Sequence, residues 1–130
     1  MPMRGVRGAT TAPANDAASI LAATAALLEE LVAANAIVRA DLAAALFTVT
    51  DDLDAAFPAQ AARQLGWEWV PLLDAREIPV PGSLPRCIRV LLLWNTERAQ
   101  DEIVHAYRNG AQRLRPDLAR PAAGERESGI

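Results

Sequence analysis

Arg89 is the strongest candidate for a functional residue in this chain, because it is a charged residue within the most hydrophobic run, Cys87–Trp94. If this run is a strand, alternate side chains share a face, and Arg89 lies on the same face as Leu91 and Leu93. A guanidinium stays charged there, and removing it from water costs several kcal/mol unless an anion replaces the water. Arg89 therefore predicts a nearby carboxylate, phosphate or anionic ligand. An internal salt bridge or an exposed strand end fits the pattern equally well.

Arginine dominates the polar chemistry of the sequence, since all thirteen basic residues are arginine. Four of them lie on or beside elements that we expect to be rigid: Arg7, Arg63, Arg89 and Arg115. A planar guanidinium binds a carboxylate through two parallel hydrogen bonds, so this set suits recognition of a small polyanion such as a dicarboxylate. Glu77 is a second candidate, a carboxylate held in the proline-rich segment Asp74–Pro85. Such a site needs no nucleophile.

The sequence gives little support to covalent or metal chemistry. It contains no serine–histidine–acid arrangement, no metal-ligand spacing and no glycine-rich phosphate loop. Cys87 is the only cysteine, and His105 is the only histidine that could activate it, so we expect Cys87 to be a packing residue. Asp51, Asp52 and Asp54 lack the glycine turn and distal glutamate of a calcium loop, and we expect them to lead into a helix. We therefore expect no metal and no cofactor.

Length and composition indicate a single globular domain: 130 residues, 52% hydrophobic and 22% charged. The net charge is −3 and aromatic residues make up 5%, so we expect no nucleic-acid partner and no membrane surface patch. No apolar run approaches the roughly 20 residues of a membrane span, and the amino terminus lacks the apolar core of a secretory signal. A reducing cytoplasm is the expected compartment. The chain is small for an enclosed active site, which favours a cleft shared between subunits.

Alternation of apolar and polar residues predicts four or five short strands. We expect them at Met3–Thr11, Leu46–Thr50, Glu68–Leu72 and Cys87–Trp94, with a further one in Glu102–Arg108, where strand is mildly favoured over two helical turns. The third strand is broken by a proline and should lie near an edge or a strand end. Asp74–Pro85 should be a rigid, non-helical connection.

One long amphipathic helix is predicted between a cap at Asn15-Asp16 and a stop at Asn35. A single turn at Leu42–Ala44 should follow Asp41, and a short helix, Ala59–Leu65, should end at Gly66. Together these elements predict an α+β fold: a mixed sheet with one long helix and short helices on one face. We expect residues 1–118 to form the domain and residues 119–130 a flexible C-terminal tail, because the last segment is small, charged and rich in proline and glycine.

Six motifs occur in an order that is specific to one protein family. They are Arg4–Thr11, Phe57–Arg63, Arg76-Glu77, Pro85–Val90, the segment around His105 and Tyr107, and Leu114–Leu118. Over Met3–Leu118 the chain resembles the trimeric α/β class of monofunctional chorismate mutases, which is distinct from the all-helical class. The resemblance implies a homotrimer with a barrel-like core, a trimeric pseudo-α/β barrel, and three active sites in clefts between subunits. It also implies the Claisen rearrangement of chorismate to prephenate, in phenylalanine and tyrosine biosynthesis.

The resemblance assigns a role to each motif residue. Arg89 matches the residue placed against the ether oxygen of the substrate, where negative charge builds up as the carbon–oxygen bond breaks. Glu77 matches the carboxylate that accepts a hydrogen bond from the substrate hydroxyl, and Arg7 counts with these two as catalytic. Further substrate-binding positions are Phe57, Ala59, Gln60, Arg63, Leu73, Asp74, Tyr107, Leu114 and Arg115. Arg7 is also a substrate-binding position: it corresponds to a carboxylate clamp with Tyr107, as Arg63 of a neighbouring chain does with Arg115. Phe57 and Leu114 correspond to apolar walls.

Two positions depart from the family pattern. Asp74 stands where a cysteine is often found, and Gln60 stands where a lysine often assists a carboxylate. A second carboxylate beside Glu77 would repel a dianionic substrate unless it points away or is paired, so these changes bear on affinity more than on reaction type. Two alternative functions stay open: an imine deaminase with a related trimeric subunit, and a non-catalytic trimer that binds metabolites or protein partners through the same clamps.

Overall fold

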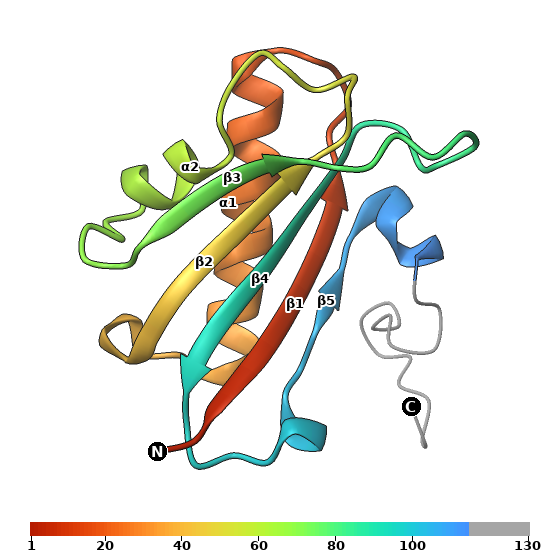
Figure 1. Ribbon diagram of the computed structural model, residues 1–130. Coiled ribbons are helices and arrows are strands. Elements are labelled where there is room, and N and C mark those ends of the chain that lie inside the picture. The colour runs from red at the N-terminus through yellow and green to blue at the C-terminus, as the bar shows by residue number, and fades with distance from the viewer. Residues whose placement is uncertain (115–130) are drawn as a thin grey trace.

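The computed structural model describes residues 1–114, which fold as a five-stranded sheet with one long helix packed across one face (Figure 1). The elements are β1 (Met3–Thr11), α1 (Ala17–Asn35), β2 (Leu42–Val49), α2 (Ala59–Gln64), β3 (Leu72–Arg76), β4 (Cys87–Asn95) and β5 (Ala106–Tyr107). Short 3₁₀ turns are formed by Arg39–Asp41, Gln100–Glu102 and Asn109–Arg113. This arrangement confirms the expected α+β class, with the helices on one side of a mixed sheet.

The strand order is β3-β2-β4-β1-β5, so β4, the strand that carries Arg89, is central. It runs antiparallel to both β1 and β2, while the two edge pairs, β2 with β3 and β1 with β5, are parallel. The edge position of β3 agrees with the expectation drawn from its neighbouring proline. A central strand is held by backbone hydrogen bonds on both sides, which makes β4 a rigid support for a functional side chain.

The core lies between α1 and one face of the sheet. Side chains from alternate strand positions, such as Val6, Phe47 and Leu92, are fully buried against the helix stripe that includes Leu27 and Leu31. Gly8 permits the closest approach, because a Cβ at this position would lie 2.7 Å from Leu31 Cδ1. The opposite face of the sheet, called here the open face, keeps Leu73 60% exposed and Leu91 37% exposed.

Helix α1 begins and ends close to the expected residues. Its N-cap is Asp16, whose carboxylate accepts a hydrogen bond from the Ser19 N–H at 2.7 Å, and this backbone bond lowers the pKa of Asp16. At the other end the chain turns through Ala36 in the left-handed region, with φ of 54°. The buried Asn35 side chain is bonded in both directions to the backbone of Val104, and also donates to the Leu31 carbonyl.

Helix α1 is long and apolar enough, by length and composition, to cross a membrane. The expectation that no apolar run approaches this length was therefore wrong for residues 17–35. Length and composition alone do not indicate a membrane, because a helix packed in a protein core shares both. In α1 the stripe from Ile20 to Leu31 is buried against the sheet, which accounts for its apolar character.

Two strands begin at residues other than the expected ones. Strand β2 starts at Leu42, because Leu42 and Ala44 already pair with β4, and the helical turn expected at Leu42–Ala44 is instead the 3₁₀ turn before it. The strand expected at Glu68–Leu72 lies further along, at Leu72–Arg76. Pro71 has no N–H to donate, so only its carbonyl joins the ladder, accepting from Ala45 N at 2.9 Å.

The segment expected as a strand at Glu102–Arg108 is mostly irregular, and only Ala106–Tyr107 pairs with β1. Glu102 ends a 3₁₀ turn, and its carboxylate accepts the Ala99 N–H at 2.8 Å. The connection expected to start at Asp74 also differs, because Asp74 still belongs to β3. Local side-chain caps and strand pairing decided these boundaries, and neither is visible in apolar alternation.

Asn35 should be the most costly polar side chain of α1 to remove. We expect Asn35→Ala to lower the free energy of unfolding by about 2 kcal/mol or more, because it leaves the Val104 N–H and C=O without their partner in a partly buried place. The measurement is urea denaturation. Asn15→Ala is the matched control, since Asn15 makes as many hydrogen bonds, to Asp54 and Ala55, on the exposed surface where water can replace them. Equal losses in the two variants would contradict this account.

Candidate active site

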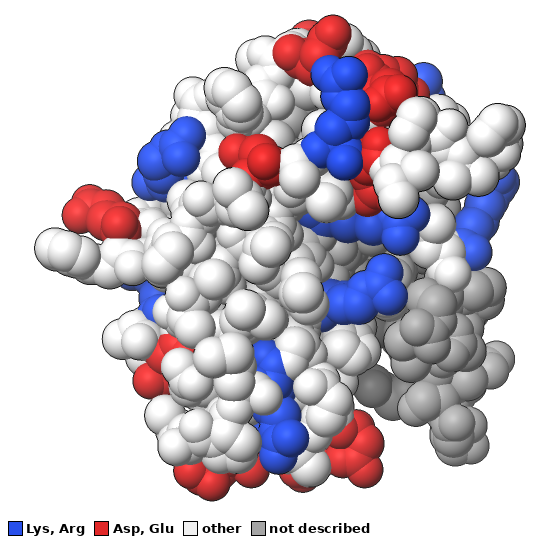
Figure 2. Space-filling view, viewed as in Figure 1, with Lys and Arg blue, Asp and Glu red and all other residues white. Residues whose placement is uncertain are grey.

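A row of paired residues crosses the open face of the sheet from β2 to β5. Thr48 pairs with Arg89, Arg89 with Ala9, and Ala9 with Tyr107. Paired residues in adjacent strands point to the same face, so all four side chains lie on the side that α1 does not cover. The small side chain of Ala9 separates the guanidinium from the phenol ring. Figure 2 views this face: uncharged atoms cover most of its centre, and several basic side chains lie over the β4 and β1 side.

Arg89 forms an ion pair with Glu77, with 3.0 Å between Nε and Oε2. Glu77 follows β3 and stays aligned with the sheet because its N–H donates to the Val49 carbonyl at 2.8 Å. The Arg89 and Glu77 side chains are 34% and 17% exposed. The Arg89 Nε–H does not point at the nearby oxygen, and within residues 1–114 this buried nitrogen has no hydrogen-bond partner. The salt bridge that the sequence allowed is therefore present, yet the guanidinium keeps donors available.

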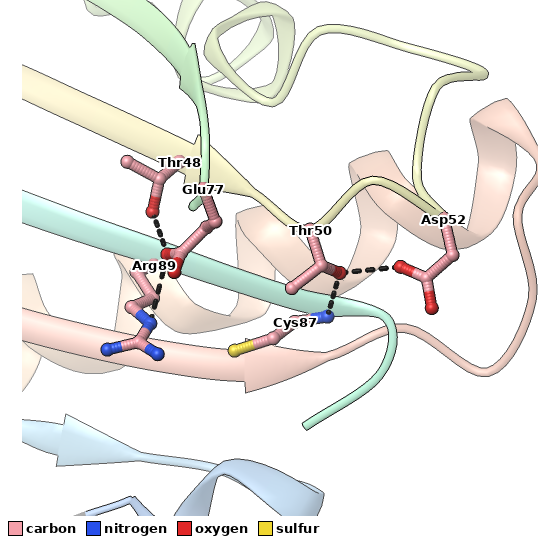
Figure 3. A network of polar contacts seen from close by, with 6 residues as sticks. All are labelled: Thr48, Thr50, Asp52, Glu77, Cys87 and Arg89. Atoms are coloured by element: carbon pink, nitrogen blue, oxygen red, sulfur yellow. Dashed lines mark hydrogen bonds and ion pairs between the residues drawn. The ribbon is translucent and has the colours of Figure 1, made fainter. Parts of the chain in front are cut away.

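The hydroxyl of Thr48 donates to the same oxygen, Glu77 Oε2 (Figure 3). Sequence reasoning missed Thr48 because threonine is an ordinary strand residue. The only signal was its place at the end of a strand next to β4, and the register that sets it opposite Arg89 is not readable from the sequence. Thr48, Glu77 and Arg89 thus come from three adjacent strands or strand ends and meet at one carboxylate oxygen.

Arg7 and Tyr107 lie together at the β1–β5 side of the row. The Arg7 guanidinium carbon is 6.0 Å from the centroid of the Tyr107 ring. The backbone N–H of Arg7 donates a hydrogen bond to His105 Nδ1 at 3.0 Å. Tyr107 is buried, and within the described chain its hydroxyl has no hydrogen-bond partner. Leu114 packs against the cluster of Ala9 and Tyr107. Positive charge and an unpaired hydroxyl in one place suit a carboxylate ligand.

Cys87 lies on β4 two residues before Arg89 and is fully buried. Burial raises the pKa of its thiol, and the Arg89 charge only partly opposes this. A buried thiol with a raised pKa is a poor nucleophile, so the structure agrees with the expectation that Cys87 is a packing residue.

A second group of predicted site residues lies on the other side of β3. Phe57, Gln60 and Asp74 line a cavity of about 480 Å³ beside the amino-terminal end of α1. Ala59 and Arg63 are on α2, next to this cavity, and Phe57 is 67% exposed. Leu73 is at the edge of the open face. The chain therefore brings Arg7, Glu77, Arg89, Tyr107 and Leu114 to one face, and it keeps the α2 residues apart from them. Arg115 lies outside the described residues.

Asp74 points away from the Glu77 of its own chain, so the two carboxylates do not face each other within one chain. Its Oδ1 accepts the Ala59 N–H at 3.0 Å, at the start of α2. Its pairing partner on β2 is the buried Phe47, so it lies on the helix-covered side of the sheet, opposite to Glu77. Burial raises the pKa of Asp74, while the Ala59 N–H and the Arg63 charge work in the other direction.

The acidic cluster after β2 has a structural use that differs from the expected one. Asp52 accepts hydrogen bonds from the Thr50 hydroxyl and the Arg86 N–H, and Asp54 binds Asn15. Asp52 and Asp54 therefore link this loop by hydrogen bonds to the segments that contain Arg86 and Asn15. They do not begin a helix, because the N-cap of α2 is Pro58. Within residues 1–114, no group of three histidine, cysteine or acidic side chains is placed to hold a metal ion.

The raised pKa of Asp74 predicts how stability depends on pH. The folded chain binds this proton more tightly than the unfolded chain, so the contribution of Asp74 is greatest below its unfolded pKa of about 3.9 and is lost as the pH rises through the folded pKa. Asp74→Asn cannot ionise and still offers an oxygen to Ala59. We expect its free energy of unfolding, relative to the parent, to increase between acid and neutral pH.

Urea denaturation from acid to neutral pH checks this prediction. Asp16→Asn is the control of opposite sign, because the pKa of Asp16 is lowered and that variant should lose stability relative to the parent as the pH rises. A relative stability of Asp74→Asn that falls with pH would show that the Asp74 carboxylate is favoured in the folded chain.

This chain is similar to proteins of known function over most of its length. The family model for chorismate mutase type I matches residues 3–118. Chorismate mutase AroH of Thermus thermophilus is 56% identical over 117 residues, which cover 89% of this chain and 96% of the relative. The AroH protein of Bacillus subtilis (strain 168) is 42% identical over 120 residues, covering 92% and 94%. A solved chorismate mutase from Clostridium thermocellum has a TM-score of 0.83 and 48% identity, covering 85% of this chain and 98% of its own. The chain therefore belongs to the type I chorismate mutase family.

Proposed function

We propose that this protein converts chorismate to prephenate by an intramolecular Claisen rearrangement, in the biosynthesis of phenylalanine and tyrosine. The observation that carries the proposal is the placement of Arg89: a guanidinium on the central strand, anchored by Glu77, with a buried Nε–H that has no hydrogen-bond partner within residues 1–114. Family membership supplies the reaction, and this geometry supplies the group that would promote it.

The reaction takes place within one molecule. The ether carbon–oxygen bond of chorismate breaks, a carbon–carbon bond forms at the far end of the side chain, and no group passes to the protein. Negative charge builds up on the ether oxygen because bond breaking runs ahead of bond formation. A guanidinium fixed at that oxygen stabilises the transition state more than the ground state, which raises the rate. Arg89 is our candidate for this role.

The other residues of the open face fit the remaining parts of the substrate. Chorismate carries two carboxylates. The Arg7 guanidinium lies near the Tyr107 ring, whose hydroxyl has no hydrogen-bond partner within residues 1–114, and this pair suits one of the two carboxylates. Glu77 suits the ring hydroxyl as a hydrogen-bond acceptor. Arg63 and Arg115 are proposed for the second carboxylate, with Phe57, Ala59, Gln60, Leu73, Asp74 and Leu114 around the ring. Holding the side chain of the substrate over the ring then supplies orientation.

We also propose that the protein is a homotrimer with an active site between each pair of neighbouring subunits. Two features support it. The centre of the open face is largely uncharged (Figure 2) and exposes Leu73 and Leu91, which suits a surface that another subunit covers. The predicted site residues fall into two groups on opposite sides of β3, so one chain cannot easily bring Arg63 to Arg89. A ring of subunits would join the group of one chain to that of the next.

The domain boundary and the compartment belong to the same proposal. The family match to residues 3–118 supports treating residues 1–118 as the catalytic domain. A cytoplasmic location accords with bacterial relatives that are chorismate mutases and with a single cysteine, Cys87, which is buried and cannot form a disulfide within the chain.

The activity itself is tested by incubating the purified protein with chorismate and a strong chelator, and following the loss of chorismate and the appearance of prephenate. We expect turnover, and we expect Arg89→Gln to lower kcat by about a hundredfold or more, because it removes one charged donor from the developing oxyanion. Arg98→Gln is the control: Arg98 stacks on Trp94 at 5.7 Å, near the opposite end of β4. A parent protein without turnover refutes the function, and an Arg89→Gln protein with normal kcat removes Arg89 from the mechanism.

The shared site is tested with two inactive variants, Arg63→Ala and Arg89→Ala. If the two arginines serve one site from neighbouring chains, co-refolding an equal mixture places both in about a quarter of the interfaces, because each side is drawn independently. Activity should therefore recover to about that fraction of the parent, whereas trimers mixed without subunit exchange should recover none. Native mass spectrometry confirms that mixed trimers have formed. If they are as inactive as the two single variants, the shared site is contradicted.

A further inference from the structure

We infer that Thr48 is a positioning residue for this reaction: its hydroxyl holds the Glu77 carboxylate in a position that leaves Arg89 free to face the substrate. The inference rests on the proposed function, because it assigns Thr48 a task within the same site.

The sheet brings Thr48 between its two charged neighbours. Strand β2 lies between β3 and β4, and Thr48 pairs with Ala75 on one side and Arg89 on the other. Glu77 is two residues beyond Ala75, and its N–H continues the ladder to the Val49 carbonyl, so its side chain keeps to the same face. The three side chains therefore meet on the open face (Figure 3).

Thr48 and Arg89 use one oxygen of the carboxylate and leave the other unused. The Thr48 hydroxyl donates to Glu77 Oε2, and Arg89 Nε lies 3.0 Å from that same atom. Within residues 1–114, Oε1 has no hydrogen-bond donor. A hydroxyl bonded to a carboxylate is a strong, charge-assisted partner, so it fixes the rotation of the carboxylate as well as its position. The free oxygen is then available to the ring hydroxyl of the substrate.

The arrangement of Arg89 depends on this restraint. A guanidinium and a carboxylate that are free to move prefer a planar pair with two parallel hydrogen bonds. Here the contact is through one nitrogen, whose N–H is not directed at the oxygen. Without the Thr48 hydroxyl, the carboxylate can turn and take two guanidinium N–H groups. Those are the donors that the ether oxygen needs, so the loss should fall on the chemical step more than on substrate binding.

Thr48→Val tests the inference, because valine keeps the β-branched shape that suits a strand and loses only the hydroxyl. We expect kcat to fall by about 10- to 100-fold, the range for losing a hydrogen bond to a charged group, with a much smaller change in KM. Thr48→Ser restores the donor and should recover most of kcat. Thr24→Val is the matched control: Thr24 is buried in α1, its hydroxyl donates to the Ile20 carbonyl, and its loss should leave kcat unchanged.

Glu77→Gln identifies the path of the effect. If Thr48 acts through Glu77, the double variant Thr48→Val/Glu77→Gln should be no slower than Glu77→Gln alone. A second loss of the same size in the double variant overturns the inference, as does a Thr48→Val protein with the kcat of the parent. If Thr48→Val does not fold, Thr48→Ala and Thr48→Ser replace it, and equal kcat values for those two overturn the inference as well. An inactive parent protein would instead refute the proposed function.

Discussion

A guanidinium on the central strand needs a counter-charge that does not use up its donors, and the structure is arranged around this constraint. The backbone of Arg89 pairs with a neighbouring strand on both sides, so the Cα position from which the side chain extends is fixed. Its counter-ion, Glu77, comes from the end of β3 and is itself bonded to Thr48. The result is a paired but incompletely satisfied arginine, which is the condition under which a charge can still stabilise a reacting oxygen.

The two faces of the sheet have separate tasks because strand side chains alternate. The face toward α1 carries the apolar residues that close the core, and Gly8 lets the helix come near. The open face carries the row from Thr48 to Tyr107, of which Ala9 and Tyr107 pack in a small cluster that is separate from the main core. Chemistry can therefore vary on one face without disturbing the packing of the other. The same separation explains why the open face still exposes leucine side chains, which no other described element covers.

The sequence was sufficient for the α+β class, the long helix, β1, β4 and the candidates Arg89 and Glu77, because strong periodicity and a charge in an apolar strand are local signals. The start of β2 and the place of β3 were wrong because pairing with β4 and the missing N–H of Pro71 decided them. Thr48 was missed for a related reason. Its importance comes from register across two strand pairs, and register depends on the whole sheet. The catalytic and binding roles of the site residues, on the strands as well as on α2, stay predictions.

Strand β3 has a part in both halves of the proposed site. Glu77 follows its last residue on the open face and forms the ion pair with Arg89, in the half of the site that belongs to the same chain. On its helix-covered face, β3 carries Asp74, which accepts a hydrogen bond from the Ala59 N–H at the start of α2. Helix α2 in turn carries Gln60 and Arg63. In the proposed trimer these α2 residues serve the neighbouring subunit's reacting group. A shift of this short edge strand would then move the anchor of one site and the clamp of the next together. The hydrogen bond from the Ala59 N–H fixes the Asp74 carboxyl group at the start of α2, and partial burial of that group raises its pKa.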